Sequence, residues 1–125
     1  MGLYNEDPRF VPMIRDGRKR FTIRARRKVE DRPGDIMHLY TGLRTRGAML
    51  IFRAPCVKVE DIEVSMIGTA FVVRVNDVVL GANEEELLAR SDGFDDFAEM
   101  IDWWAPNIPF EGKINHWDFE RRRLE

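Results

Sequence analysis

The chain has 125 residues, of which 44% are hydrophobic and 10% aromatic, and a formal net charge of −2 at pH 7. This length supports one domain with a single core, and no apolar run reaches the ~20 residues that span a bilayer. The start of the chain lacks the apolar segment of a secretory signal. The single cysteine, Cys56, lies in the apolar stretch APCVKV. We therefore expect a cytoplasmic protein in which Cys56 is a small buried hydrophobe.

The small net charge conceals a strong asymmetry along the chain. Residues 9–53 hold thirteen Lys and Arg against four Asp and Glu, whereas residues 54–125 hold seven against sixteen. Seven of the basic side chains fall within GRKRFTIRARRK, residues 17–28. This pattern indicates either a basic surface for an anionic partner or pairing between the two halves across the fold.

The N-terminal part of the chain predicts a short helix and a strand. Residues 1–8 are polar, so we expect a loose lead-in. Apolar residues recur at helical spacing over residues 10–14, and Gly17 is placed to end that helix. Residues 20–24 then alternate as in a strand, which puts three polar side chains on one face: Arg20, Thr22 and Arg24.

The middle of the chain is rich in strand patterns. After the turn DRPGD come residues 36–42, then 45–64 as one long or two consecutive strands, and then 69–77. The segment NDVVLG predicts a tight hairpin with a short partner strand.

Helical periodicity follows, before a final strand at 112–119. Asn83 and Glu86 have the spacing of a capping box for a helix over 84–90. A second helix is predicted over 94–104, with a buried stripe of Phe94, Phe97, Ile101 and Trp104.

The predicted strands outnumber the helices and do not alternate with them as in βαβ units. This order favours an α+β fold with a mostly antiparallel, barrel-like sheet. We expect one domain over residues 1–120. Residues 121–125 form a basic tail with solvated arginines, and its final Leu-Glu matches a vector-derived addition.

Four segments occur in order between about Phe10 and Trp117: GRKRFTIR, RPGDIMHLYTGLRTRG, LARSDGFDDFAEMIDWW and FEGKINHW. Together they resemble the ASCH domain family of the PUA-like superfold. The resemblance implies a small β-barrel with a few flanking helices, a cleft between barrel and helices, and an association with RNA or modified nucleosides.

Our leading hypothesis is that a basic cleft binds RNA or another nucleoside or nucleotide ligand. Arginine forks suit phosphates, and aromatic rings stack on single-stranded bases. The candidate binding residues are Arg18, Lys19, Arg20, Arg24, Arg26, Arg44 and Arg46, with Tyr40 as a stacking ring. The alternative for each arginine is an ordinary solvated or ion-paired side chain.

A second hypothesis is catalytic, because one branch of the family resembles amidohydrolases that act on acetylated cytidine. The resemblance implies that the catalytic residues of that branch correspond to Lys19, Thr22 and Asp92 in this sequence. There the threonine would attack the amide, the lysine would take its proton, and the carboxylate would orient the lysine. This sequence has Asp92 where the branch has glutamate, and Asp92 with Gly93 also suits the N-cap of the following helix.

A third hypothesis is a protein-interaction module that uses the acidic segment 84–102. Metal binding is not predicted, because His38 and His116 lack ligand spacing. A cofactor is not predicted either, because there is no G-x-G-x-x-G and no P-loop.

Overall fold

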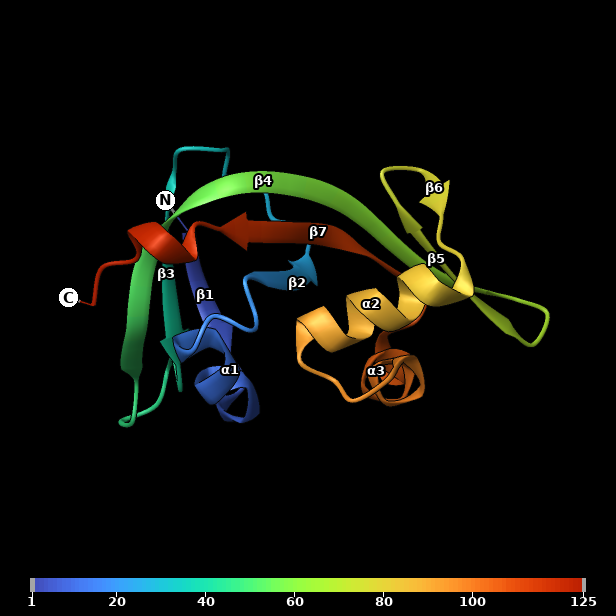
Figure 1. Ribbon diagram of the computed structural model, residues 1–125, viewed down its shortest axis with the longest axis horizontal. Helices are drawn as coiled ribbons and strands as arrows, with labels where there is room; N and C mark the ends of the chain where they lie inside the picture. The colour runs from blue at the N-terminus through green and yellow to red at the C-terminus, as the bar shows by residue number, and fades with distance from the viewer. Residues whose placement is uncertain (1, 125) are drawn as a thin grey trace.

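One long strand, β4 (Met49–Ile67), runs through the whole sheet of this computed structural model, which describes residues 2–124 (Figure 1). It pairs with β3 (Ile36–Thr41), then with β7 (Phe110–Trp117), and near its end with β5 (Ala70–Val75). On the outer sides, β1 (Gly2–Glu6) pairs with β3, β2 (Phe21–Ala25) with β7, and β6 (Val78–Val79) with β5. The predicted strands are therefore confirmed, and residues 45–64 belong mainly to one strand.

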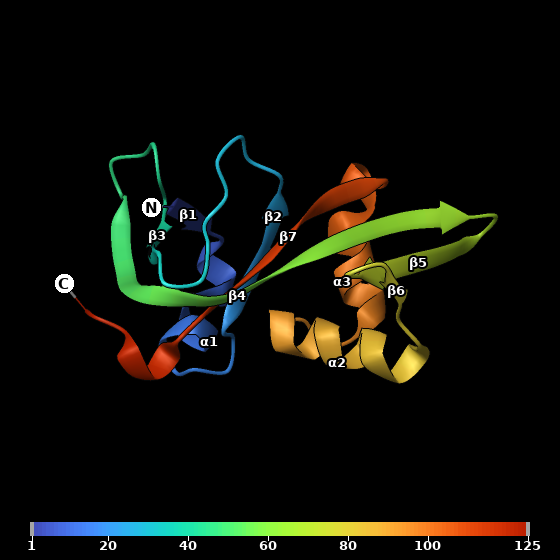
Figure 2. The same ribbon diagram turned by 90° about the horizontal axis from the view of Figure 1, so that it is seen from above.

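Three helices flank the sheet: α1 (Val11–Arg15), α2 (Ala82–Asp92) and α3 (Phe97–Trp104). Short 3-10 turns complete the structure: η1 (Pro8–Phe10), η2 (Ala105–Asn107) and η3 (Phe119–Arg121). Helix α1 lies near β1 and β3, whereas α2 and α3 lie together at the other end of the molecule (Figures 1 and 2). The predicted α+β class is confirmed.

The expectation of a loose lead-in is wrong, because residues 2–6 form β1. This strand runs parallel to β3, whereas every other ladder is antiparallel. Its side chains alternate, so that Tyr4 is 1% exposed and Glu6 is 6% exposed. Burial of this face explains why a polar segment becomes a strand.

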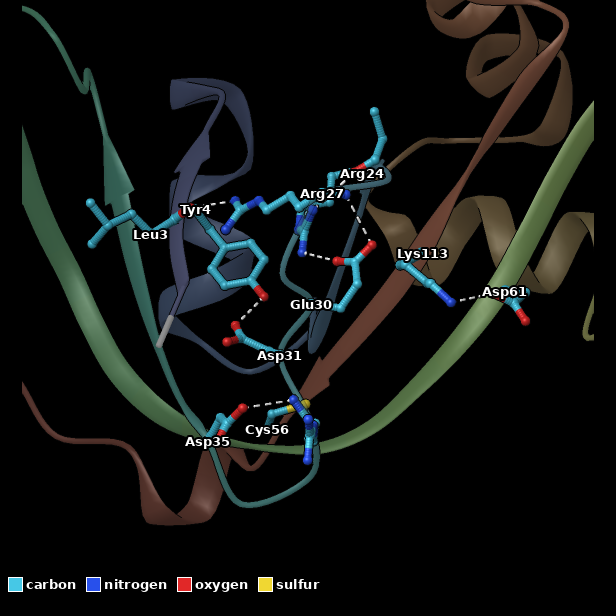
Figure 3. A network of polar contacts seen from close by, with 12 residues as sticks. Leu3, Tyr4, Arg24, Arg27, Glu30, Asp31, Asp35, Cys56, Asp61 and Lys113 are labelled. Carbon is cyan, nitrogen blue, oxygen red and sulfur yellow. Dashed lines mark hydrogen bonds and ion pairs between the residues drawn. The ribbon is translucent and has the colours of Figure 1, made fainter.

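The sheet stays open and does not close into the predicted barrel. Among the described residues β1 pairs only with β3 and β2 only with β7, so no backbone ladder joins β1 to β2. Side chains connect β1 instead to the segment that follows β2, residues 26–35 (Figure 3). The Tyr4 hydroxyl donates to the Asp31 carboxylate, and the Arg27 guanidinium donates to the Leu3 carbonyl.

Two apolar clusters share the core. One lies between α1 and the β1–β3–β4 part of the sheet and includes Ile14, Leu39 and Phe52. The other lies between α3 and the β4–β5–β7 part and includes Ile62, Val73 and Ile101. Cys56 is buried in the first cluster, as predicted, and this burial raises the pKa of its thiol.

The helix ends differ from prediction in ways that local hydrogen bonds explain. Helix α2 begins earlier than the Asn83 capping box, because the Gly81 N–H donates to the Glu84 carboxylate at 2.9 Å. Glu86 instead accepts from the Phe97 N–H at 2.9 Å and so ties α2 to α3.

Helix α3 begins at Phe97 because the Asp96 carboxylate caps it, accepting from the Glu99 N–H at 2.8 Å. Phe94 therefore lies in the preceding loop, where it is buried against Phe10 at a ring-centroid distance of 5.4 Å. Within the predicted stripe Ile101 is also buried, but Phe97 and Trp104 are only half-buried.

Candidate functional site

Lys19 lies between α1 and β2 and is only 3% exposed. Its Nζ donates to the main-chain oxygen of Asp92 at 2.7 Å and also to the Asp92 carboxylate. The rings of Phe10 and Phe21 lie 4.9 and 5.4 Å from this nitrogen. The ammonium is thus shielded from water and held by one carboxylate and two aromatic faces.

Asp92 is the last residue of α2, 73 positions away from Lys19 in the sequence. The helix ends there because Gly93 adopts a left-handed conformation with a φ of 106°. A Cβ atom at Gly93 would lie 2.7 Å from the Phe10 ring, so only glycine fits this turn. The predicted N-cap role of Asp92 is wrong, since Asp96 caps α3. Burial raises the pKa of the Asp92 carboxyl, and the Lys19 charge opposes that shift.

Thr22 and Glu6 complete this polar group. Thr22 is 8% exposed and lines the same cavity as Glu6, which lies at the end of β1. Burial raises the pKa of Glu6, whereas Lys19 and Thr22 act in the opposite direction. Sequence reasoning missed Glu6 because it treated residues 1–8 as a lead-in. The signal was the two-residue spacing of Tyr4 and Glu6, which puts them on one face of a strand.

These four side chains line one cavity of about 160 Å³. The motif-derived group of Lys19, Thr22 and Asp92 is therefore brought together, with Glu6 as an additional member. Most of the remaining wall is aromatic, with Phe10, Phe94, Trp103 and Trp104, and Asn5, Asp7 and Ile23 complete it. Because Trp103 is 43% exposed, this wall continues to the molecular surface.

A buried amide lies next to Thr22 on the neighbouring strand. Asn115 of β7 is the register partner of Thr22 and has no exposed surface. Neither its side-chain nitrogen nor its side-chain oxygen has a hydrogen-bond partner among the described residues. A buried amide without a hydrogen-bond partner destabilises the fold, and this one lies directly opposite the candidate nucleophile in the β2–β7 ladder.

The candidate nucleic-acid-binding residues do not gather on one face. Four of the arginines form ion pairs: Arg18 with Asp16, Arg20 with Glu120, Arg24 with Glu30 and Arg26 with Asp61. Arg44 and Arg46 are exposed in the loop 42–48, which follows β3, whereas Arg26 lies in the segment that precedes β3 (Figure 1). The two basic segments are therefore at opposite ends of this strand. Tyr40 is half-buried on β3.

The acidic segment 84–102 uses several of its carboxylates within the domain. Glu84 and Glu86 accept the main-chain hydrogen bonds described above, and Asp92 holds Lys19. Glu99 forms an ion pair with Arg9. The ion pairs of Asp92 and Glu99 reduce the charge that the segment can offer to a basic partner.

The two histidines lie apart from this cavity. His38 is on β3, and His116 of β7 contacts the Glu60 carboxylate at 2.6 Å. Burial lowers the pKa of both imidazoles. Residues 2–124 contain no group of three or more His, Cys, Asp or Glu side chains placed to hold a metal ion. Within the same range, no helix combines the length and apolar character needed to cross a membrane.

Comparison of the chain with protein-family models, with curated proteins and with solved structures finds no match. A functional conclusion therefore has to come from the geometry of the site.

Proposed function

We propose that the protein is a small amidohydrolase that removes a short acyl group from the exocyclic amine of a nucleobase, with acetylated cytidine as the candidate substrate. The observation that supports this most strongly is the single cavity that joins a hydroxyl, an ammonium and two carboxylates. Amide hydrolysis needs a nucleophile, a proton acceptor and a stabilised oxyanion, and these side chains can supply all three.

In the proposed first step, the Thr22 oxygen attacks the acyl carbonyl and its proton passes to the Glu6 carboxylate. Glu6 is suited to this role because it lines the same cavity as Thr22 and because burial raises its pKa. The Lys19 ammonium stabilises the developing oxyanion while Asp92 keeps it in place. Lys19 thus acts as an electrostatic partner rather than as the base implied by the family resemblance.

In the second step, the tetrahedral intermediate collapses, the C–N bond breaks, and the leaving amine takes the proton held by Glu6. Water then attacks the acyl-threonine ester and gives a proton to Glu6. The ester C–O bond breaks, Glu6 returns that proton to the Thr22 oxygen, and the carboxylic acid leaves. The buried Asn115 amide lies beside Thr22, where it can help to orient the reacting groups.

The cavity also suggests a size limit for the acyl group. A volume of about 160 Å³ equals roughly five water molecules, which is enough for an acetyl group but not for a whole nucleoside. The base would then lie towards the surface, where the exposed ring of Trp103 offers a stacking face.

The ASCH-type assignment is part of the same proposal. It is supported by the lining of the hydrolytic cavity. Strand β2, which carries the T-I-R sequence, and the C-terminal end of α2 both contribute residues to it, as the resemblance implies. We infer that the open sheet is a variant of the PUA-like barrel in which β1 contacts the segment after β2 through side chains, in place of a backbone ladder between β1 and β2.

A direct assay is hydrolysis of N4-acetylcytidine by the wild type, Thr22→Val and Thr69→Val. Thr22→Val removes the nucleophile while nearly preserving shape, and we expect a loss of roughly 10⁴-fold or more. The control residue Thr69 is exposed and lies outside the cavity, so Thr69→Val should keep wild-type turnover. Wild-type protein without turnover, or full activity in Thr22→Val, would contradict the proposal.

A second candidate function is RNA or nucleotide binding by the loop 42–48. It is favoured by Arg44 and Arg46, which are exposed and form no ion pair among the described residues. Phosphate contacts release counterions, so affinity for a single-stranded RNA should fall steeply with salt and should weaken in the Arg44→Gln/Arg46→Gln double variant. Binding that is independent of salt would contradict this function.

A further inference from the structure

A second cavity, of about 530 Å³, lies on the opposite face of β3 and β4 from the core residues Met37 and Leu39. Side chains alternate along β3, so burial of these two residues turns Ile36 and His38 to the other face. The basic lining of the cavity consists of His38, Arg53, Arg121 and Arg123, and its apolar lining includes Ile36 and Pro55.

Three of these basic side chains form a row across adjacent backbone segments. His38 is the register partner of Arg53 in the β3–β4 ladder. Arg53 in turn pairs with Arg123 through two main-chain hydrogen bonds of 2.9 and 2.7 Å. Directly paired residues of a ladder project from the same face, so two guanidinium groups and an imidazole lie side by side. The main chain of the C-terminal segment is thus anchored to β4, while the Arg121 and Arg123 side chains are exposed, as predicted for the tail.

The two guanidinium groups of this row are not paired with carboxylates of the described residues. Among residues 2–124, neither Arg53 nor Arg123 forms an ion pair, and none of the described residues that line the cavity is acidic. Arg121 has a partner nearby, Asp118, at 3.8 Å. Like charges that lie directly opposite each other destabilise a sheet, so this arrangement favours an anion that compensates them.

Two buried polar atoms strengthen the case for a ligand. The Nε of Arg53 and the Nε2 of His38 have no hydrogen-bond partner among the described residues. Burial and the charge of Arg53 lower the pKa of His38, while buried Asp31 acts in the opposite direction. The low pKa is consistent with a positive local field, which an anion would relieve.

We propose that this cavity binds a phosphate group, either as inorganic phosphate or as the phosphomonoester of a small molecule. Guanidinium groups bind phosphate oxygens through paired N–H donors, and Arg53 and Arg123 present two such groups in adjacent positions. Ile36 and Pro55 offer apolar surface for the organic part of a phosphomonoester. This site shares no lining residue with the hydrolytic cavity, so the proposal of phosphate binding does not depend on the proposed hydrolase function.

The test is a calorimetric titration of the full chain with inorganic phosphate and, separately, with cytidine 5′-monophosphate. Arg53→Gln and Arg123→Gln should each weaken binding at least tenfold. Arg90→Gln removes an equal charge from the exposed face of α2, away from this cavity, and should change affinity less than twofold. Because the Arg123 side chain is exposed, Arg123→Gln should melt no lower than the wild type in phosphate-free buffer.

The two ligands distinguish the source of the phosphate. Tighter binding of the nucleotide supports a phosphomonoester, and equal affinities support inorganic phosphate. Absence of saturable binding by the wild type would overturn the proposal. So would unchanged affinity in both cavity variants, or an equal loss in Arg90→Gln, which would reveal a general charge effect.

Discussion

Replacing Lys19 by methionine should strongly destabilise the domain, because two buried carboxylates would lose their only cavity-lining cation. The side chains of Lys19 and Asp92 are 4% and 6% exposed, and Glu6 lies in the same cavity. Removal of one partner from a buried ion pair costs about 3–5 kcal/mol. For 125 residues, this loss corresponds to a decrease in Tm of roughly 11–19 °C.

Urea denaturation at neutral pH measures this effect, with Arg18→Met as the matched control. Arg18 is the neighbour of Lys19, but its side chain is 67% exposed and pairs with an exposed Asp16. The control should therefore change the free energy of unfolding by no more than about 1 kcal/mol.

A double variant tests whether the loss comes from the uncompensated charge. Lys19→Met/Asp92→Asn removes both members of the pair and should recover part of the stability lost in Lys19→Met. Equal stability of Lys19→Met and Arg18→Met would refute the reasoning, because it would mean that the pair is not shielded from water.

Two further predictions concern the surroundings of this pair. Burial raises the folded-state pKa of Glu6, so its ionisation opposes folding as the pH rises above the unfolded value. Glu6→Gln should therefore gain stability relative to the wild type between about pH 4 and pH 7 in urea melts, and a constant difference would count against a buried carboxyl. Phe94→Ala should cost about 3–5 kcal/mol because the ring is 4% exposed, whereas Trp104→Ala should cost less because its ring is half-buried. Equal losses in thermal melts would indicate that the two rings are buried to the same extent.

The sequence by itself determined most of the elements, because their signals are local. Alternation over residues 20–24 and 36–42 identified β2 and β3. The segment 76–81 identified the turn and the short second strand of the β5–β6 hairpin. The same alternation placed Thr22 on a defined side of its strand. The resemblance to the ASCH family, not periodicity, pointed to Lys19, Thr22 and Asp92, which line one cavity in the structure.

The helix boundaries show where local signals compete. Both Gly81 and Asn83 are plausible residues for the start of α2, and both Asp92 and Asp96 for the start of α3. The competition was settled by tertiary packing: burial of Asp92 against Lys19 leaves Asp96 as the cap. Propensity is a weak guide when two neighbouring residues can fill the same role.

Only the tertiary structure decided which distant residues become neighbours. Residues 2–6 are a strand because they pair in parallel with β3, more than thirty positions later, and this pairing brings Glu6 to Thr22. The Arg53–Arg123 pair likewise depends on the path of the C-terminal segment back to β4. The periodicity of a segment reports which of its side chains share a face, but it carries no information about the segment that will cover that face. That choice depends on how the whole chain buries its apolar surface. For this reason only the fold showed the surroundings of Glu6 and Asn115 and the row of His38, Arg53 and Arg123.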